Sequence, residues 1–237
     1  MERRTKWQVD WGTAVMALCA VSVTGIVGAR QIHDWRTVAE APARSKPAPP
    51  AFVKDWRNLI ASGERLGPQS APVVVAEFGD FQCPVCRLFK RTYDSVSMAL
   101  GDTVALVFVH FPLKSIHHFA DAAARASECA ANQGRFAAFY DLAYAKQDSL
   151  GIKTWQSFAR EAGVPNLPQF DTCTSDTLQT GRVSRGHQAG EQLGVKGTPT
   201  LLINGWEYSG ALRSDRLDSA IHMLLRGKPA PAFSRGR

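Results

Sequence analysis

Two cysteines separated by two residues are the clearest chemical feature of this sequence. Cys83 and Cys86 enclose the dipeptide Pro84-Val85. Three residues apart on a helix, the two side chains face the same side and can close a tight disulfide. A cysteine at the start of a helix also lies beside unpaired backbone N–H groups, which stabilise a thiolate and lower its pKa. The spacing therefore predicts reversible disulfide chemistry with an acidic thiol at Cys83.

A strand and a helix are predicted on either side of this pair. Residues 73–78 are rich in β-branched side chains and are bounded by Pro72 and Gly79, which indicates a buried strand. Pro84 suits the first helical position, where its missing N–H has no partner to lose. The apolar spacing after Cys83 predicts a helix, with one face formed by Val85, Phe89, Thr92, Val96 and Ala99.

Further along the chain, the pattern predicts a mixed α/β domain. Residues 103–111 read as a second strand, parallel to the first because a helix connects them. Residues 116–193 read as mainly helical, with a turn between Pro165 and Pro168. A short amphipathic helix is predicted over Phe52–Ser62, before the first strand.

The period changes again near the C-terminus. Residues 200–203 and 206–209 predict two short antiparallel strands, because Asn204-Gly205 is a strong hairpin signal. Ser214 is predicted to cap a final helix. The order is therefore βαβ, a helical block, and ββα.

The N-terminus is predicted to lie outside this fold. Residues 12–29 carry no charge and span roughly 27 Å as a helix, close to the hydrocarbon thickness of a bilayer. Arg3, Arg4 and Lys6 precede them and favour a cytoplasmic N-terminus. The alternative is a cleaved signal peptide, for which Val27-Gly28-Ala29 is an acceptable site. Both readings export the body of the chain.

These observations divide the 237 residues into five parts. The Pro- and Ala-rich segment before the body reads as a semi-rigid linker. The predicted parts are a cytoplasmic basic N-terminus (1–11), a transmembrane anchor or signal segment (12–29), a linker (30–50), a catalytic domain (51–225) with a helical insert at about 116–193, and a basic tail (226–237).

The net charge of +7 is concentrated at the two ends of the chain. Residues 1–6 and 226–237 carry +2 and +4 of it, and the body is close to neutral. A nucleic-acid-binding face needs clustered basic residues, so no nucleic-acid partner is predicted. The tail is read as a solvated chain end.

Taken together, the motifs resemble the thioredoxin superfamily, in particular its DsbA-like branch with a helical insertion. The resemblance lies in the run Ala71–Cys86 (APVVVAEFGDFQCPVC) and in Gly197-Thr198-Pro199-Thr200, which looks like the family's cis-proline loop. It covers roughly residues 67–225, and it implies a thioredoxin-like α/β fold.

The resemblance also implies a role for each site residue. Cys83 is expected to be the exposed nucleophile and Cys86 the buried resolving thiol. Glu77 matches a buried acid that relays protons to the resolving thiol; the alternative is a strand-end carboxylate facing water. Pro199 is expected to be cis, the alternative being a trans proline that starts a strand. Client contacts are expected at Thr198, Pro84 and Val85.

Two further cysteines lie in the helical block. Many DsbA-like proteins carry a bridged pair in the insert, so a structural disulfide is expected between Cys129 and Cys173; two buried free thiols are the alternative.

No metal site and no cofactor are predicted, because a single Cys-x-x-Cys supplies only two ligands. Phe81 and Phe89 are either a client-facing patch or core.

The resulting prediction is an extracytoplasmic, membrane-anchored enzyme, a protein thiol–disulfide oxidoreductase. It is expected to act as a monomer in the periplasm, to donate the Cys83–Cys86 disulfide to reduced exported proteins, and to be reoxidised by a membrane quinone-linked partner. The direction of transfer comes from the resemblance. The alternatives are a reductase or isomerase of exported disulfides, and a non-redox client- or metal-binding module on the same fold.

Overall fold

The computed structural model describes residues 50–176 and 181–233. The predicted cytoplasmic segment, the transmembrane segment and all of the linker but its last residue lie outside the described residues, as does the end of the basic tail. Among the residues that are described, no helix is long and apolar enough to cross a membrane.

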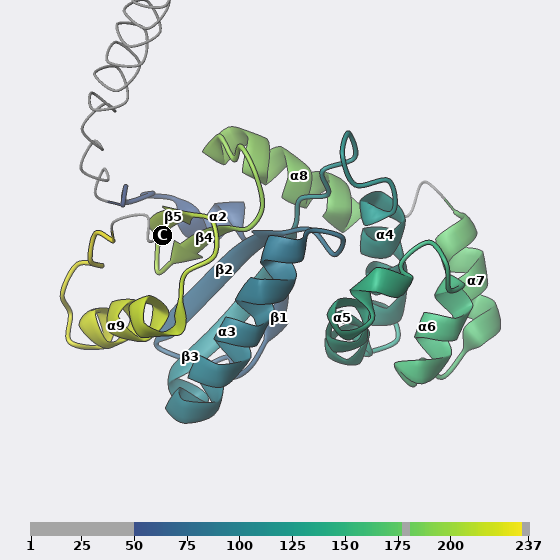
Figure 1. The fold of residues 1–237 in the computed structure, drawn as a ribbon, viewed down its shortest axis with the longest axis horizontal. Helices are drawn as coiled ribbons and strands as arrows, with labels where there is room; N and C mark the ends of the chain where they lie inside the picture. Colours follow the sequence, from purple (N-terminus) through teal and green to yellow (C-terminus); the bar gives the residue numbers. More distant parts are fainter. Residues whose placement is uncertain (1–49, 177–180, 234–237) are drawn as a thin grey trace, which may run out of the picture. The chain divides into compact units, whose positions relative to one another are not determined.

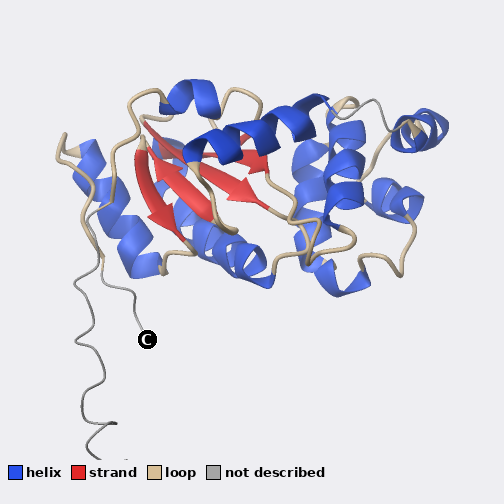
Figure 2. Ribbon diagram, turned by 90° about the horizontal axis from the view of Figure 1, so that it is seen from above, coloured by secondary structure: helices blue, strands red, loops and turns tan. Residues whose placement is uncertain are grey.

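A five-stranded mixed sheet forms the centre of the molecule, with helices on both faces (Figure 2). Its strand order is β1-β3-β2-β4-β5. The bounds are β1 Glu64–Leu66, β2 Val73–Gly79, β3 Val104–His110, β4 Thr200–Ile203 and β5 Trp206–Ser209. The pair β2 and β3 is parallel as predicted, and the other neighbours are antiparallel.

The central strand β2 carries the chain to the cysteines. Six of its seven residues are buried, as expected for a strand covered on both faces. The helix α3 (Pro84–Leu100) begins five residues after β2 ends, with Cys83 at its N-cap and Pro84 in its first turn. Gly101 then ends the helix with a φ of 55°, a conformation that glycine adopts without strain.

The helical block inserted between β3 and β4 gathers mainly to one side of the sheet, where α4 to α7 pack together (Figure 1). The long helix α8 crosses back over the sheet and contacts β3. The bounds are α4 Ala120–Ala131, α5 Phe136–Ala145, η2 Gln147–Ser149, α6 Trp155–Glu161, α7 Leu167–Ser175 and α8 Gly181–Leu193. The predicted helical insertion is therefore present.

The chain ends in a hairpin and a helix. The turn between β4 and β5 has positive φ at Asn204 (46°) and Gly205 (91°), as the Asn-Gly signal predicts. The last helix, α9, spans Ser214–Leu225. Its N-cap is Arg213 and no side chain caps it, so the prediction that Ser214 is the cap is wrong.

Three other elements differ from the prediction. The helix expected over Phe52–Ser62 is only one turn, α2 (Trp56–Leu59), because Phe52 instead forms an isolated β-bridge with Trp206. The strand β1 was not predicted; it is three half-buried residues long, too short for a periodic signal. Pro168 lies in the first turn of α7 rather than in a loop, because Asn166 caps that helix through the Gln169 N–H.

Candidate active site

The two cysteines lie at the N-terminus of α3 as free thiols. Cys86 is fully buried and Cys83 is 4% exposed, so the description of Cys83 as an exposed residue is wrong. Pro84 and Val85 between them are exposed, with Val85 at 41%. The surface over this pair is therefore apolar, and a partner must approach Cys83 across the exposed dipeptide.

The loop before β4 lies against the nucleophile. The Thr198–Pro199 peptide bond is cis, and the Cys83 Sγ donates a hydrogen bond to the Thr198 carbonyl oxygen at 3.3 Å. This contact joins residues 115 positions apart in the chain. The structure thus brings together the two motifs, Cys-Pro-Val-Cys and Thr-Pro, on which the predicted site depends.

The surroundings of Cys83 favour its thiolate. The Cys86 side chain, through a hydrogen bond to the Cys83 sulfur, is the largest cause that lowers the pKa of Cys83, and the value falls to about 5 despite burial. The backbone N–H groups of Cys86 and Val85 act in the same direction. Burial, reinforced by Cys83 and Glu77, raises the pKa of Cys86 well above its ordinary value. One turn of helix therefore separates a strong thiol acid from a weak one.

This asymmetry predicts how the reduced protein reacts with an alkylating reagent. Because the pKa of Cys83 is lowered, its thiolate is present above about pH 5 and is lost as the pH falls through that value. The rate of modification by iodoacetamide is therefore expected to reach half of its plateau near pH 5. A midpoint near the ordinary thiol value in the wild-type protein would contradict the assignment; Cys86 does not compete for the reagent in this range, because its own pKa is raised.

Glu77 lies beneath the cysteines on β2. Its side chain is completely buried, so the alternative of a strand-end carboxylate facing water is wrong. Burial raises its pKa to about 8, and the Cys83 charge adds to that shift, whereas Cys86, Tyr140 and Lys90 oppose it. The Tyr140 hydroxyl donates to Glu77 Oε2 at 3.5 Å, and Oε1 is buried without a hydrogen-bond partner. Glu77 is thus a carboxylic acid that carries a proton at neutral pH.

The comparison with protein families decides the kind of domain. A family model described as thioredoxin (Thioredoxin_4) matches residues 61–223. This chain belongs to the thioredoxin family. The matched range includes every predicted site residue and the whole helical block.

Two solved structures have the same fold as this chain. BdbD from Bacillus subtilis superposes with a TM-score of 0.64 at 20% identity, over 77% of this chain and 98% of that one. A periplasmic thioredoxin-like protein from Salmonella enterica serovar Typhimurium has a TM-score of 0.60 at 18% identity, over 74% and 99% of the two chains. The predicted thioredoxin family is therefore confirmed by the family model, and the predicted thioredoxin-like fold by these structures.

A curated relative is much longer than this chain. The Na(+)/H(+) antiporter NhaA 3 of Salinispora tropica is 34% identical over 157 residues, which cover 65% of this chain and 24% of the relative. The chain thus spans about a quarter of the length of the curated relatives it matches. The antiporter activity that this name states is a property of the whole relative, of which the match covers 24%.

Several residues that support the thioredoxin-family site were not predicted from the sequence. Asp80, in the turn before Cys83, accepts hydrogen bonds from the Leu113 backbone N–H (2.9 Å) and from His117 Nδ1 (2.7 Å). The Gln82 side chain accepts from the Phe119 N–H at 2.7 Å. These hydrogen bonds connect the cysteine turn to the loop that precedes α4. The only signal for them in the sequence was an acidic residue, Asp80, directly after the strand.

The second pair of cysteines forms a disulfide within the helical block. Cys129 on α4 is joined to Cys173 on α7, with a sequence separation of 44 residues, as the resemblance implied.

Phe81 and Phe89 are at most 1% exposed, so they belong to the core and not to a client-facing patch. Among the described residues no group of three or more His, Cys, Asp or Glu side chains could hold a metal ion.

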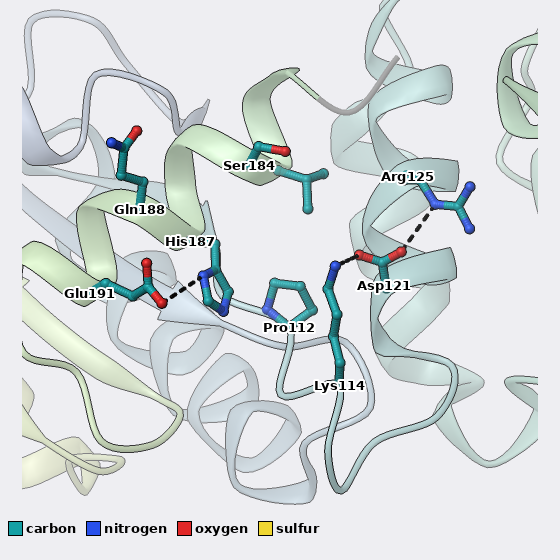
Figure 3. A pocket seen from close by; sticks show the side chains of 9 residues that line it. Pro112, Lys114, Asp121, Arg125, Ser184, His187, Gln188 and Glu191 are labelled. Atoms are coloured by element: carbon teal, nitrogen blue, oxygen red, sulfur yellow. Dashed lines mark ion pairs between the residues drawn. The ribbon is translucent and has the colours of Figure 1, made fainter. Parts of the chain in front are cut away.

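A separate pocket of about 500 Å³ lies between α4 and α8 (Figure 3). Asp121 pairs there with Lys114 (2.7 Å) and Arg125 (3.3 Å), and His187 faces Glu191 at 3.7 Å. The positive and negative side chains that line this pocket thus largely neutralise one another. Neither Cys83 nor Cys86 lines it. The chemistry of the molecule is centred on the N-terminus of α3.

Proposed function

We propose that this chain is a thiol–disulfide oxidoreductase that donates the Cys83–Cys86 disulfide to reduced proteins. The observation that supports it best is the opposite displacement of the two thiol pKa values across one helical turn. A thiol of low pKa is a good leaving group, so a mixed disulfide on Cys83 is readily released to the client. Stabilising the Cys83 thiolate also stabilises the reduced protein, which makes its disulfide more oxidising.

The proposed transfer takes two steps. A client thiolate attacks Cys83 Sγ, the Cys83–Cys86 bond breaks, and its electron pair leaves on Cys86. A second client thiolate then attacks the client sulfur of the mixed disulfide, and Cys83 leaves as a thiolate. The client is oxidised by two electrons and the enzyme is reduced to the dithiol. The cis loop supports the first step, because Thr198 lies within reach of the Cys83 sulfur.

Glu77 is proposed to manage the proton of Cys86. The departing Cys86 thiolate is buried and its pKa is raised, so it needs a proton as it leaves. Glu77 still carries one at neutral pH because burial raises its pKa to about 8. The Cys86 side chain lowers the pKa of Glu77, so the two groups interact, and the unpartnered Glu77 Oε1 is proposed as the atom that exchanges the proton with Cys86.

Replacing Glu77 with glutamine is expected to slow reduction of the oxidised protein on the order of 10²-fold, because glutamine cannot supply that proton. The stopped-flow rate with a dithiol peptide, corrected for the peptide's own thiolate fraction, should fall in the wild type as the pH rises through the pKa of Glu77, which burial raises above its ordinary value. The Glu77→Gln protein should lack this step. Identical pH profiles for the two proteins would remove Glu77 from the mechanism.

The cellular setting is part of the same proposal. We place the domain outside the cytoplasm, held at the membrane by residues 12–29, with exported proteins as clients and a quinone-linked membrane protein as the oxidant. The internal disulfide supports this placement, because structural disulfides persist in oxidising compartments. One structural neighbour is described as periplasmic.

The proposal is tested by mixing the oxidised full chain with a reduced peptide that contains two cysteines. Stoichiometric formation of the peptide disulfide, with loss of the Cys83–Cys86 bond, is the expected result. A chain that leaves the peptide reduced but reduces a peptide disulfide instead would reverse the proposed direction. A chain that does neither would not be an oxidoreductase.

A further inference from the structure

The turn that presents Cys83 is held by several hydrogen bonds that converge on Asp80. Within the turn, the Cys83 N–H donates to the Asp80 carbonyl oxygen (3.1 Å) and the Gln82 N–H donates to Asp80 Oδ1 (2.7 Å). The Tyr144 hydroxyl donates to the same Asp80 carbonyl oxygen at 3.3 Å. These two N–H groups are thereby satisfied within the turn. The Cys83 carbonyl oxygen accepts the Arg87 N–H of α3 at 3.2 Å, and the Phe81 carbonyl oxygen needs a donor from elsewhere.

Gln147 supplies the donor for Phe81 and a second donor for Cys83. Its side-chain Nε2 donates to the carbonyl oxygens of both Phe81 (2.7 Å) and Cys83 (2.9 Å). Gln147 is only 6% exposed, and it stands in η2 at the end of α5, more than 60 residues away in the chain. One amide group of the helical insertion thus bridges the carbonyl oxygen of Cys83 and that of Phe81, two residues earlier.

The bridge bears on the chemistry as well as on the shape of the turn. A carbonyl oxygen carries a partial negative charge, and two of them in the backbone around Cys83 oppose a thiolate there. An amide N–H directed at each oxygen offsets that charge. It also fixes the φ and ψ angles that set the Cys83 sulfur against Thr198 and the N-terminus of α3.

We propose that Gln147 is a positioning residue of the redox site, through which the helical insertion holds the Cys83 turn in its reactive geometry. It touches neither sulfur and acts through the backbone on either side of Cys83. This inference rests on the proposed function for its significance, and its test is independent of that function.

The test measures the alkylation of Cys83 by iodoacetamide against pH in the reduced full-length chain. Replacing Gln147 by Leu removes both donors, and the pH of half-maximal rate is expected to rise by about one unit. The rate at pH 5 then falls roughly three- to tenfold, while the plateau at high pH is retained. Gln147→Glu keeps the shape but directs an oxygen at the two carbonyls, so its midpoint is expected to rise further.

Gln133 offers a matched control. It is also a glutamine of the insertion whose side chain bridges to backbone, donating to the Asn166 carbonyl oxygen at 3.0 Å, but it contacts no part of the Cys83 turn. Gln133→Leu is expected to leave the Cys83 titration unchanged even if it lowers the melting temperature as much as Gln147→Leu does. A shift in both leucine variants would mean that loosening the insertion is enough.

The proposal is overturned if folded Gln147→Leu and Gln147→Glu proteins titrate as the wild type does. Gln147→Glu covers the case in which the leucine variant does not fold. If the wild-type chain titrates near pH 5 but oxidises no dithiol peptide, the assignment as a disulfide donor fails while the Gln147 comparison still stands. The two results are therefore separable.

Discussion

Replacing Cys83 with serine is expected to abolish disulfide donation, reducing the rate with a dithiol peptide to that of the uncatalysed mixture. Cys83 is the thiol whose pKa is lowered to about 5, so it supplies both the sulfur that a client attacks and the thiolate that leaves. Serine is close in size but cannot form a disulfide or a stable anion at this pH. The measurement is the rate of peptide oxidation under a defined glutathione buffer.

The variant at the second cysteine is the control that identifies the roles. Cys86→Ser retains the nucleophile and lacks the resolving thiol, so its Cys83 thiolate should attack a peptide disulfide, release one peptide sulfur as a thiolate and accumulate a mixed disulfide that survives on a non-reducing gel. Cys83→Ser should accumulate none, because Cys86 is fully buried. The assigned roles are wrong if the trapped complex forms through Cys86. If cellular function survives when both residues are replaced with alanine, the domain acts as a binding module.

Removing the disulfide of the helical block should produce the largest loss of stability. The Cys129→Ala, Cys173→Ala protein lacks a link across 44 residues, which in the chain-entropy model is worth about 4 kcal/mol of unfolding free energy. Urea unfolding measures it directly. The loss should appear as a lower midpoint, because the bond joins α4 to α7 and restricts the unfolded chain of the insertion.

The reduced wild type provides the matching control for that experiment. A strong thiol reductant opens both disulfides, so it should bring the wild-type midpoint down toward that of the alanine variant, while leaving the variant's own midpoint comparatively unaffected. The folded variant should still oxidise a dithiol peptide, because the internal pair is separate from the Cys83–Cys86 site. Equal midpoints for the oxidised wild type and the variant would show that the bond adds nothing to stability.

Local patterns predicted the elements that carry the cysteines. The β-branched run before Gly79 and the apolar spacing after Cys83 each depend on neighbours in sequence, and β2 and α3 lie where those patterns place them. The Asn204-Gly205 turn was predictable for the same reason. The burial of Cys83 was not, because it depends on the Thr198 loop, which folds against it from 115 residues away.

The residues that hold the cysteine turn in place could not be predicted from the sequence either. Asp80 meets His117, and Gln147 meets the carbonyl oxygens of Phe81 and Cys83, only after the helical block has packed beside the sheet. A glutamine after a helix carries no periodic signal, and its value lies in where tertiary packing directs its amide. The strand β1 was missed because three residues are too few for a periodic pattern. It forms by pairing with β3, which is distant in the sequence.

The reduction potential of the Cys83–Cys86 pair tests the central claim most directly. The full chain is equilibrated with glutathione buffers of graded ratio, and the fraction of dithiol is measured after acid quenching. A Cys83 pKa of about 5 lies between those of strong periplasmic oxidants and thioredoxin, so a potential of roughly −180 mV is predicted, between about −120 and −270 mV. A value near −270 mV would contradict disulfide donation and identify the protein as a reductase.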